Sequence, residues 1–283
     1  MESLVSKDEV RRAVAEARAV GQRIALVPTM GALHEGHLSL VRAARERAEY
    51  VVVSVFVNPT QFGPGEDFEA YPRDLEGDLE LLEAEGVALV FAPATATMYA
   101  PGATVTVDPG PLGDVLEGAI RPTHFRGVCT VVAKLFGIVA PDLAFFGEKD
   151  FQQLAIVRAM VSDLDLPVRV VGCPTIREPD GLALSSRNVY LSPDERAAAT
   201  VLYRALRAAE ARALAGERDA RALVEVMRAE IATEPLVVPD YAEVADAVTL
   251  VPLDALDGSP ARALVAARLG STRLIDNLAL EVG

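Results

Sequence analysis

The chain has 283 residues, 51% of them apolar, which is enough to bury one large core or a large and a small one. Asp and Glu outnumber Lys and Arg by 41 to 27, giving a formal net charge of -14, so a surface that binds nucleic-acid phosphates is not expected. Apolar runs fall short of the roughly 18 residues of a membrane-spanning helix, and the N-terminus does not resemble a signal peptide, so we expect a cytoplasmic protein away from membranes. Cys129 and Cys173 make no disulfide framework, and we expect both to be buried thiols.

The first part of the chain alternates helices with short apolar strands. Ser6 and Glu9 form a capping-box pattern that predicts an amphipathic helix. A strand at 24–27 is expected to stop at Pro28 and to lead into a helix over 38–48. The pattern continues, with strands expected at 51–57, 87–91, 143–146 and 168–172 and helices at 74–85, 130–139 and 151–161. Continuous apolar strands indicate a parallel sheet covered on both faces, so we predict a doubly wound, Rossmann-like α/β domain over residues 1–175.

The remaining residues, 176–283, differ in composition. The segment 196–232 is rich in Ala, Arg and Glu and contains two helical stretches. Short strand-like pieces follow at 263–267 and 273–276. We predict a second, smaller α/β domain here.

Two of the three histidines lie close together in VPTMGALHEGHLSL, residues 27–40. His34 and His37 follow a strand and open a helix, where unpaired amides favour anions and where Gly31 and Gly36 let a ligand approach the backbone. We therefore interpret the two imidazoles as donors to phosphate oxygens. The alternative is that one histidine caps the helix while the other packs beneath it.

Other ligand classes are less well supported. A zinc site would need HExxH spacing, whereas these histidines are three apart and only His124 and scattered carboxylates could complete a shell, so no metal ligand is assigned. The phosphate-binding fingerprints GxxxxGK[ST] and GxGxxG after the first strand are also absent.

Two further segments carry polar groups at turns. FFGEKDFQQL, residues 145–154, follows a strand, so Lys149 is a candidate triphosphate contact. Asp150 is a candidate for ribose hydroxyls or for a water around magnesium, although Lys149 and Asp150 could also form a surface pair. DGLALSSRN, residues 180–188, lies at the expected domain junction and suits a mobile phosphate clamp; a serine-capped turn is the alternative.

Together these segments resemble the pantothenate synthetase family, within the wider group of HIGH-motif nucleotidyltransferases. HEGH stands in the place of HIGH, and LSSR in the place of the KMSKS-type loop. VSVFVNPTQFGPGEDFEAYPRD and THFRGVCTVVAKL also occur in the family's order, so the resemblance spans residues 24–190 and weakens after about residue 195. One departure is Leu184 where the family commonly has methionine, a change of similar volume that should preserve adenine packing.

The resemblance implies an ATP-dependent ligase that condenses pantoate with β-alanine through a pantoyl-adenylate, releasing pyrophosphate and AMP. It implies ATP as a substrate, with Mg²⁺ carried by the phosphates, no organic prosthetic group, a homodimer, and a smaller domain that acts as a lid. His37, His34 and Lys149 are the implied catalytic residues. The implied ATP contacts are Met30, Gly31, His34, Gly36, His37, Gly147, Glu148, Lys149, Asp150, Ile176, Leu184, Ser185, Ser186 and Arg187. The implied pantoate and β-alanine contacts are Asn58, Gln61 and Gln153.

Several neighbouring features are less specific. Apart from the resemblance, Asn58-Pro59 reads as a turn and Gln61 as an exposed amide. The segment 63–67 is similar to a lid over the intermediate, His124 is interpreted as structural, and Arg121 or Arg126 is a candidate for a substrate carboxylate.

Three other functions remain as alternatives. An adenylyltransferase would leave the adenylate as its product, and a nucleotide-binding protein without catalysis would not need the histidine pair. A synthetase that charges tRNA would need a basic surface that this acidic chain does not show.

Overall fold

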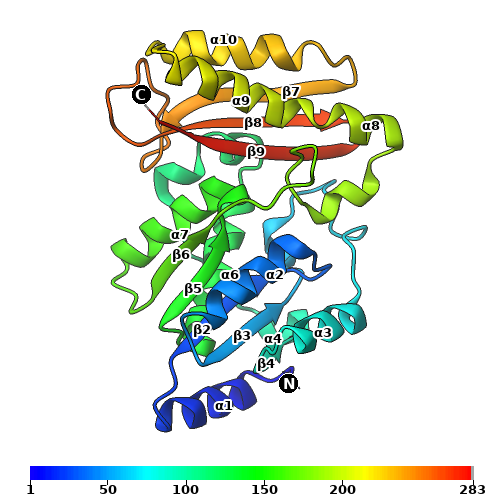
Figure 1. Cartoon of the computed structure of the whole chain (residues 1–283). Coiled ribbons are helices and arrows are strands. Elements are labelled where there is room, and N and C mark those ends of the chain that lie inside the picture. Colours follow the sequence, from blue (N-terminus) through cyan, green and yellow to red (C-terminus); the bar gives the residue numbers. More distant parts are fainter. Residues whose placement is uncertain (282–283) are drawn as a thin grey trace. The chain divides into compact units, whose positions relative to one another are not determined.

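The computed structural model describes residues 1–281, which divide into two compact units (Figure 1). The first unit contains Met1–Glu148 and Gln152–Pro174, and the second contains Lys149–Phe151 and the chain from Thr175 onward. The first unit is built on a six-stranded sheet and the second on a three-stranded sheet.

The first unit alternates strands with helices along the chain. Its strands are β1 (Glu2–Leu4), β2 (Ile24–Thr29), β3 (Tyr50–Val55), β4 (Leu89–Phe91), β5 (Leu143–Gly147) and β6 (Arg169–Cys173). Its helices are α1 (Lys7–Ala19), α2 (Glu35–Arg45), α3 (Leu75–Ala84), α4 (Thr95–Met98), α5 (Glu117–Ile120), α6 (His124–Val139) and α7 (Phe151–Asp163). Short 3-10 helices occur at Pro59–Gln61, Gly110–Gly113 and Glu148–Asp150.

All neighbouring strands of this sheet are parallel, in the order β1-β4-β3-β2-β5-β6. The chain adds strands outward from β2 on one side and then from β5 on the other, so the predicted doubly wound α/β fold is confirmed. The change of direction lies between β2 and β5. In open α/β sheets, ligands bind outside the carboxyl ends of the strands at this point.

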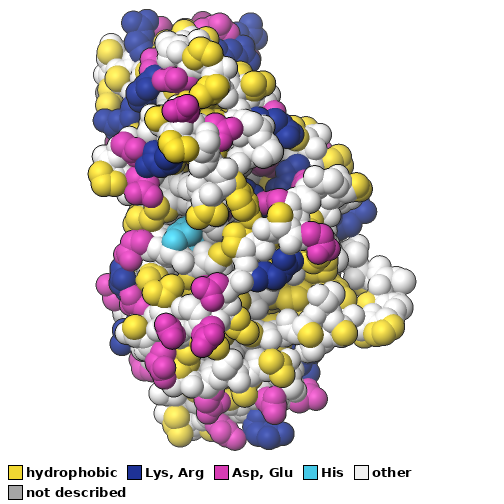
Figure 2. Space-filling view, turned by 90° about the vertical axis from the view of Figure 1, so that its right-hand side faces the viewer, with side chains coloured by type: hydrophobic (Ala, Val, Ile, Leu, Met, Phe, Trp, Pro, Cys, Tyr) yellow, Lys and Arg dark blue, Asp and Glu magenta, His cyan; other side chains and the backbone are white. Residues whose placement is uncertain are grey.

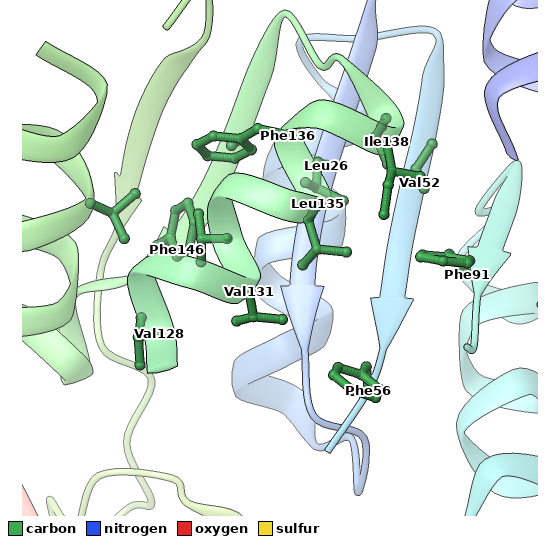
Figure 3. Close-up of a cluster of buried hydrophobic side chains, with 14 of the residues drawn as sticks. Leu26, Val52, Phe56, Phe91, Val128, Val131, Leu135, Phe136, Ile138 and Phe146 are labelled. Atoms are coloured by element: carbon green, nitrogen blue, oxygen red, sulfur yellow. The ribbon is translucent and has the colours of Figure 1, made fainter. Parts of the chain in front are cut away.

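Alternate residues of each strand enter two different cores, which explains why the strands read as continuous apolar runs. Leu26 of β2 and Val52 of β3 pack with α1, α6 and α7 on one face. Figure 3 shows Leu135 and Ile138 of α6 beside Leu26 and Val52. The intervening residues, such as Val27, pack with α2 and α3 on the other face.

Two details of the predicted elements were wrong. Ser6 is the N-cap of α1, but its side chain makes no capping hydrogen bond. Strand β2 continues through Pro28 to Thr29, because pairing with β5 ends at Leu26 and a missing amide beyond that point breaks no bond on that side.

The second unit packs two helices against an antiparallel sheet. Its elements are a 3-10 helix at Ser186–Tyr190, α8 (Pro193–Ala198), α9 (Val201–Leu214), α10 (Ala220–Ile231), β7 (Val237–Asp246), β8 (Ala261–Leu269) and β9 (Thr272–Leu280). The strand order is β7-β8-β9, and α9 and α10 supply much of a separate core with residues such as Leu206, Leu223 and Val265. The sequence predicted two of these three helices and the approximate positions of β8 and β9.

Cys129 and Cys173 are buried free thiols, as predicted, and burial raises the pKa of Cys129 to about 12. On the face drawn in Figure 2, acidic side chains are spread out with basic ones between them. Among residues 1–281, no helix combines the length and the apolar character needed to cross a membrane.

Candidate active site

The candidate site begins at the carboxyl ends of β2 and β5, the neighbouring strands at which the sheet changes direction. The loop after β2 carries Met30 and Gly31 and ends at His34. Strand β5 ends at Gly147, which is followed directly by Glu148. The topology therefore brings the first two motifs to one edge of the sheet.

His34 and His37 form a reciprocal cap at the start of α2. The Nδ1 atom of His34 accepts a hydrogen bond from the backbone amide of Gly36 at 3.1 Å. The Nδ1 atom of His37 accepts one from the amide of His34 at 3.4 Å, and the ring centroids are 4.2 Å apart. This is the arrangement of a capping box, with imidazoles in the places of the usual hydroxyl and carboxylate.

The cap determines how the imidazoles can act. A neutral imidazole has one donor and one acceptor nitrogen, and both Nδ1 atoms accept from the backbone. The neutral form of each ring therefore carries its proton on Nε2, where it can donate to an anion. Capping and anion binding use different ring nitrogens, so the two interpretations of the histidines are compatible.

Two side chains that the sequence did not single out hold the loop before His34. Thr29 Oγ1 donates to the carbonyl oxygen of Ser54 at 2.7 Å and accepts from the amide of Gly31 at 3.3 Å. Asp78, on α3, accepts from the amides of Ala32 at 3.0 Å and Leu33 at 2.7 Å. In the sequence Asp78 looks like one more acidic residue of a surface helix, so only the fold identifies its contacts.

The predicted substrate contacts Asn58 and Gln61 are both buried. Asn58 is 1% exposed; its Nδ2 donates to Gln61 Oε1 at 3.1 Å and its Oδ1 accepts from Tyr99 Oη at 2.8 Å. The Nε2 atom of Gln61 lies 3.1 Å from the sulfur of Met30. The expectation of an exposed Gln61 was wrong, and Asn58 orients Gln61 beside the loop that leads to His34.

The arginines proposed for a substrate carboxylate already have acidic partners. Arg121 forms two hydrogen bonds with Glu66, at 2.7 and 2.6 Å, and Arg126 pairs with Asp108 at 2.9 Å. Although burial works to raise the pKa of Glu66, the hydrogen bonds and charge of Arg121 lower it overall. The segment 63–67 is therefore tied to Arg121 in this structure.

Residues after Gly147 continue the second motif. The Lys149 ammonium lies 3.4 Å from Asp150 Oδ1, and the Lys149 carbonyl oxygen accepts from Asn277 Nδ2 at 2.8 Å. The pairing of Lys149 with Asp150 matches the alternative raised from the sequence. Gln153, on the first turn of α7, is half-buried.

The third motif forms a compact turn in the second unit. The Leu184 amide donates to the Ile176 carbonyl at 3.0 Å, and Ser185 caps the following 3-10 helix by accepting from the Arg187 amide at 3.3 Å. Ser186 and Arg187 lie in that helix and are half-buried. The serine-capped turn, which was the alternative inferred from the sequence, is present. The role of this segment as a phosphate clamp stays a prediction.

Comparisons with known proteins identify a family to which this chain is similar. Residues 2–279 match the family model described as pantoate-beta-alanine ligase. A protein named pantothenate synthetase from Rubrobacter xylanophilus is 58% identical, with 98% of each chain covered. The crystal structure of pantothenate synthetase from Thermus thermophilus matches with a TM-score of 0.93 and 50% identity over 98% of this chain and 99% of that one.

A second solved structure is more distant in sequence. It is the pantoate-beta-alanine ligase of Francisella tularensis, complexed with beta-gamma ATP and beta-alanine, which matches with a TM-score of 0.82 and 32% identity over 100% of this chain and 99% of that one. With the family model and a relative of this identity both covering nearly the whole chain, the protein belongs to the pantoate-beta-alanine ligase family.

Proposed function

We propose that this chain catalyses the ATP-dependent condensation of pantoate with β-alanine to give pantothenate, AMP and pyrophosphate. The observation that carries the proposal is the histidine cap at the sheet's switch point, in a chain that matches the ligase family along its length. The Francisella relative is complexed with beta-gamma ATP and beta-alanine, which correspond to two of the reactants.

The reaction balances in two steps. A pantoate carboxylate oxygen attacks the α-phosphorus of ATP, the bond to the bridging oxygen breaks, and pyrophosphate leaves. The β-alanine amine then attacks the acyl carbon, AMP leaves, and the nitrogen loses a proton. Both steps require two reactants to be aligned and phosphoryl charge to be stabilised, and neither requires a nucleophile from the protein.

The first unit supplies donors and positioning groups for these steps. His34 and His37 donate from Nε2 to phosphate oxygens while the start of α2 favours the anion, and Gly31 and Gly36 leave the backbone accessible. Gln61 binds pantoate, supported by its place beside Met30, with Asn58 holding it.

Other residues complete the site in the proposal. Lys149, Ser185, Ser186 and Arg187 bind phosphates, Gly147, Glu148 and Asp150 bind the ribose side, and Met30, Ile176 and Leu184 line the adenine pocket. Gln153 is the second pantoate contact, which its half-buried amide supports. ATP enters with Mg²⁺ on its phosphates, the second unit acts as a lid, and the enzyme works as a cytoplasmic homodimer.

Omitting each substrate in turn tests the activity. We expect steady AMP release only with ATP, pantoate and β-alanine together, and a single stoichiometric burst of pyrophosphate when β-alanine is left out. An adenylyltransferase would instead release pyrophosphate continuously without β-alanine. Absence of turnover with every pantoate mixture would refute the ligase.

His37→Ala tests the histidine pair. Loss of a preorganised donor to a charged transition state costs about 10²–10³-fold in rate, so the pyrophosphate burst should slow by that factor. Loss of the cap costs about 1 kcal/mol, a shift of only a few degrees in Tm. Ser39→Ala is the matched control, because Ser39 Oγ donates to the Gly36 carbonyl on the same helix without belonging to the imidazole pair; it should keep the wild-type rate. An unchanged burst in His37→Ala would favour a noncatalytic nucleotide-binding protein.

A further inference from the structure

The loop between β2 and α2 adopts a backbone that an ordinary chain does not hold by itself. Gly31 and Ala32 both have positive φ angles, +85° and +51°. For a residue with a side chain, the left-handed region costs about 1–2 kcal/mol. In a turn of this kind, successive backbone amides can point to one side and form a concavity that suits an anion.

Asp78 fills that concavity. One carboxylate oxygen accepts from Ala32 and the other from Leu33, and the residue is 3% exposed. The carboxylate also packs on Gly31, where an added Cβ would lie 2.8 Å from Asp78 Oδ2 and 3.1 Å from a methyl carbon of Val55. Amides, carboxylate and glycine therefore fit one another closely.

The charge of Asp78 is held at a cost. Burial raises the pKa of Asp78, and the amides of Leu33 and Ala32 oppose that rise only in part. A buried carboxylate is rarely retained for stability alone, because well-packed apolar groups stabilise a protein as well. What the Asp78 carboxylate does here is to fix the loop between β2 and α2.

We infer that Asp78 is a positioning residue for phosphoryl transfer: its carboxylate fixes residues 32 and 33 and so sets both imidazoles of the His34–His37 cap. The inference rests on the proposed role of the histidines. Leu33 directly precedes His34, and His34 in turn orients His37 through its own amide. A shift at the carboxylate is therefore transmitted through two residues of backbone to both Nε2 atoms.

Asp78→Asn tests this with little change of shape. One amide keeps an acceptor, but the other faces the NH₂ group of asparagine, so one hydrogen bond is replaced by a donor facing a donor. We expect the adenylation rate to fall about 10–100-fold, as for a misplaced reacting group. The KM for β-alanine should stay within about twofold. Asp78→Ser, shorter and neutral, provides the same test if the asparagine variant folds poorly.

The matched control is Asp74→Ala on the same helix. Asp74 caps α3 by accepting from Gly77 at 3.0 Å, so its loss costs about 1 kcal/mol without contact to the loop. Adenylation should stay at the wild-type rate in this variant. An equal loss of rate in Asp74→Ala would show that helix stability explains the effect and would overturn the inference.

Imidazole ¹⁵N resonances give a readout that does not depend on activity. The chain has 3 histidines, so His124 serves as an internal reference. In Asp78→Asn we expect the signals of His34 and His37 to move or broaden while His124 stays fixed. Unmoved signals overturn the positioning role. Moved signals with a wild-type adenylation rate support the placement by Asp78 and refute the catalytic role proposed for the histidines.

Discussion

His124 lies at the start of α6, where its Nδ1 atom is 2.8 Å from the carbonyl oxygen of Gln61. A carbonyl oxygen only accepts, so Nδ1 carries the proton and donates. The pKa of His124 is lowered to about 4, mainly by burial and also by the charge of Arg121, while the Gln61 carbonyl opposes the shift. The histidine is therefore neutral in the folded protein at neutral pH, and it holds the segment that carries Gln61, as expected of a structural residue.

This shift predicts how stability depends on pH. The unfolded chain takes up the proton near pH 6.5 and the folded chain only near pH 4, so the stabilisation is complete above pH 6.5 and is lost as the pH falls toward 4. Between pH 7 and 5 the wild type should lose about 2 kcal/mol more free energy of unfolding than His124→Gln, which cannot titrate. Urea unfolding at stepped pH measures the difference. Parallel curves for the two proteins would mean that His124 takes up its proton equally in both states.

In the second unit, the segment that contains Arg177 and Gly181 precedes the turn formed by Ser185, Ser186 and Arg187. Contacts of Arg177 hold this segment in place. The guanidinium of Arg177 forms hydrogen bonds with both carboxylate oxygens of Asp276, at 2.6 and 2.9 Å, and stacks over the ring of Tyr203 at 4.0 Å. It also donates to the carbonyl of Gly181 at 3.1 Å. Gly181 therefore lies against the ring that Arg177 covers, and it sets the path of the chain into residues 182–187.

Gly181→Ala should disturb this element strongly. Gly181 has φ +96°, and an added Cβ would lie 2.2 Å from Tyr203 Cδ1. Backbone strain and overpacking together should lower the free energy of unfolding by about 2–4 kcal/mol. The KM for ATP should rise as the turn moves.

Gly216→Ala provides the control, since Gly216 has φ +105° in the same unit but no atom within 4 Å of the added Cβ. Backbone strain alone should cost it about 1 kcal/mol and leave the KM for ATP unchanged. Equal losses in the two variants would contradict the assigned contact with Tyr203.

Elements buried on both sides were predictable from the sequence, and small or polar ones were not. Strands β2, β3 and β5 could be recognised as apolar runs, because neighbouring residues enter different cores and nearly all are apolar. Strand β1 has three residues and begins with Glu2, and β7 contains Pro239 and Asp240, so neither shows an apolar pattern. Helix α2 starts at Glu35 rather than Leu38, because the imidazole of His34 caps it.

The candidate site divides in the same way. The HEGH segment, next to Gly at the end of a strand, could be identified in the sequence, whereas the chain around Asn58 was assigned from the family resemblance. Asp78 could not be identified, because its partners Ala32 and Leu33 are more than forty residues away in sequence. Contacts between side chains and distant backbone amides depend on the fold and leave no local pattern.

At the scale of the whole molecule, charge bears on assembly. Each chain carries a formal net charge of -14, and the acidic groups on the face in Figure 2 are dispersed, so two chains repel each other at long range. The Debye length falls from about 30 Å at 0.01 M salt to about 8 Å at 0.15 M. Repulsion between two whole chains is therefore strong at low salt and largely screened at 0.15 M.

The proposed homodimer should accordingly tighten as salt is added. Light scattering at 0.15 M salt should give about twice the 30.1 kDa of one chain, and the dissociation constant should fall between 0.01 and 0.15 M salt because screening removes more repulsion than attraction. A dimer that loosens with salt would instead be held by ion pairs across its interface, and this account of its assembly would be wrong. A mass of one chain at about 50 µM protein, a concentration far above the Kd of a stable interface, would refute the dimer itself.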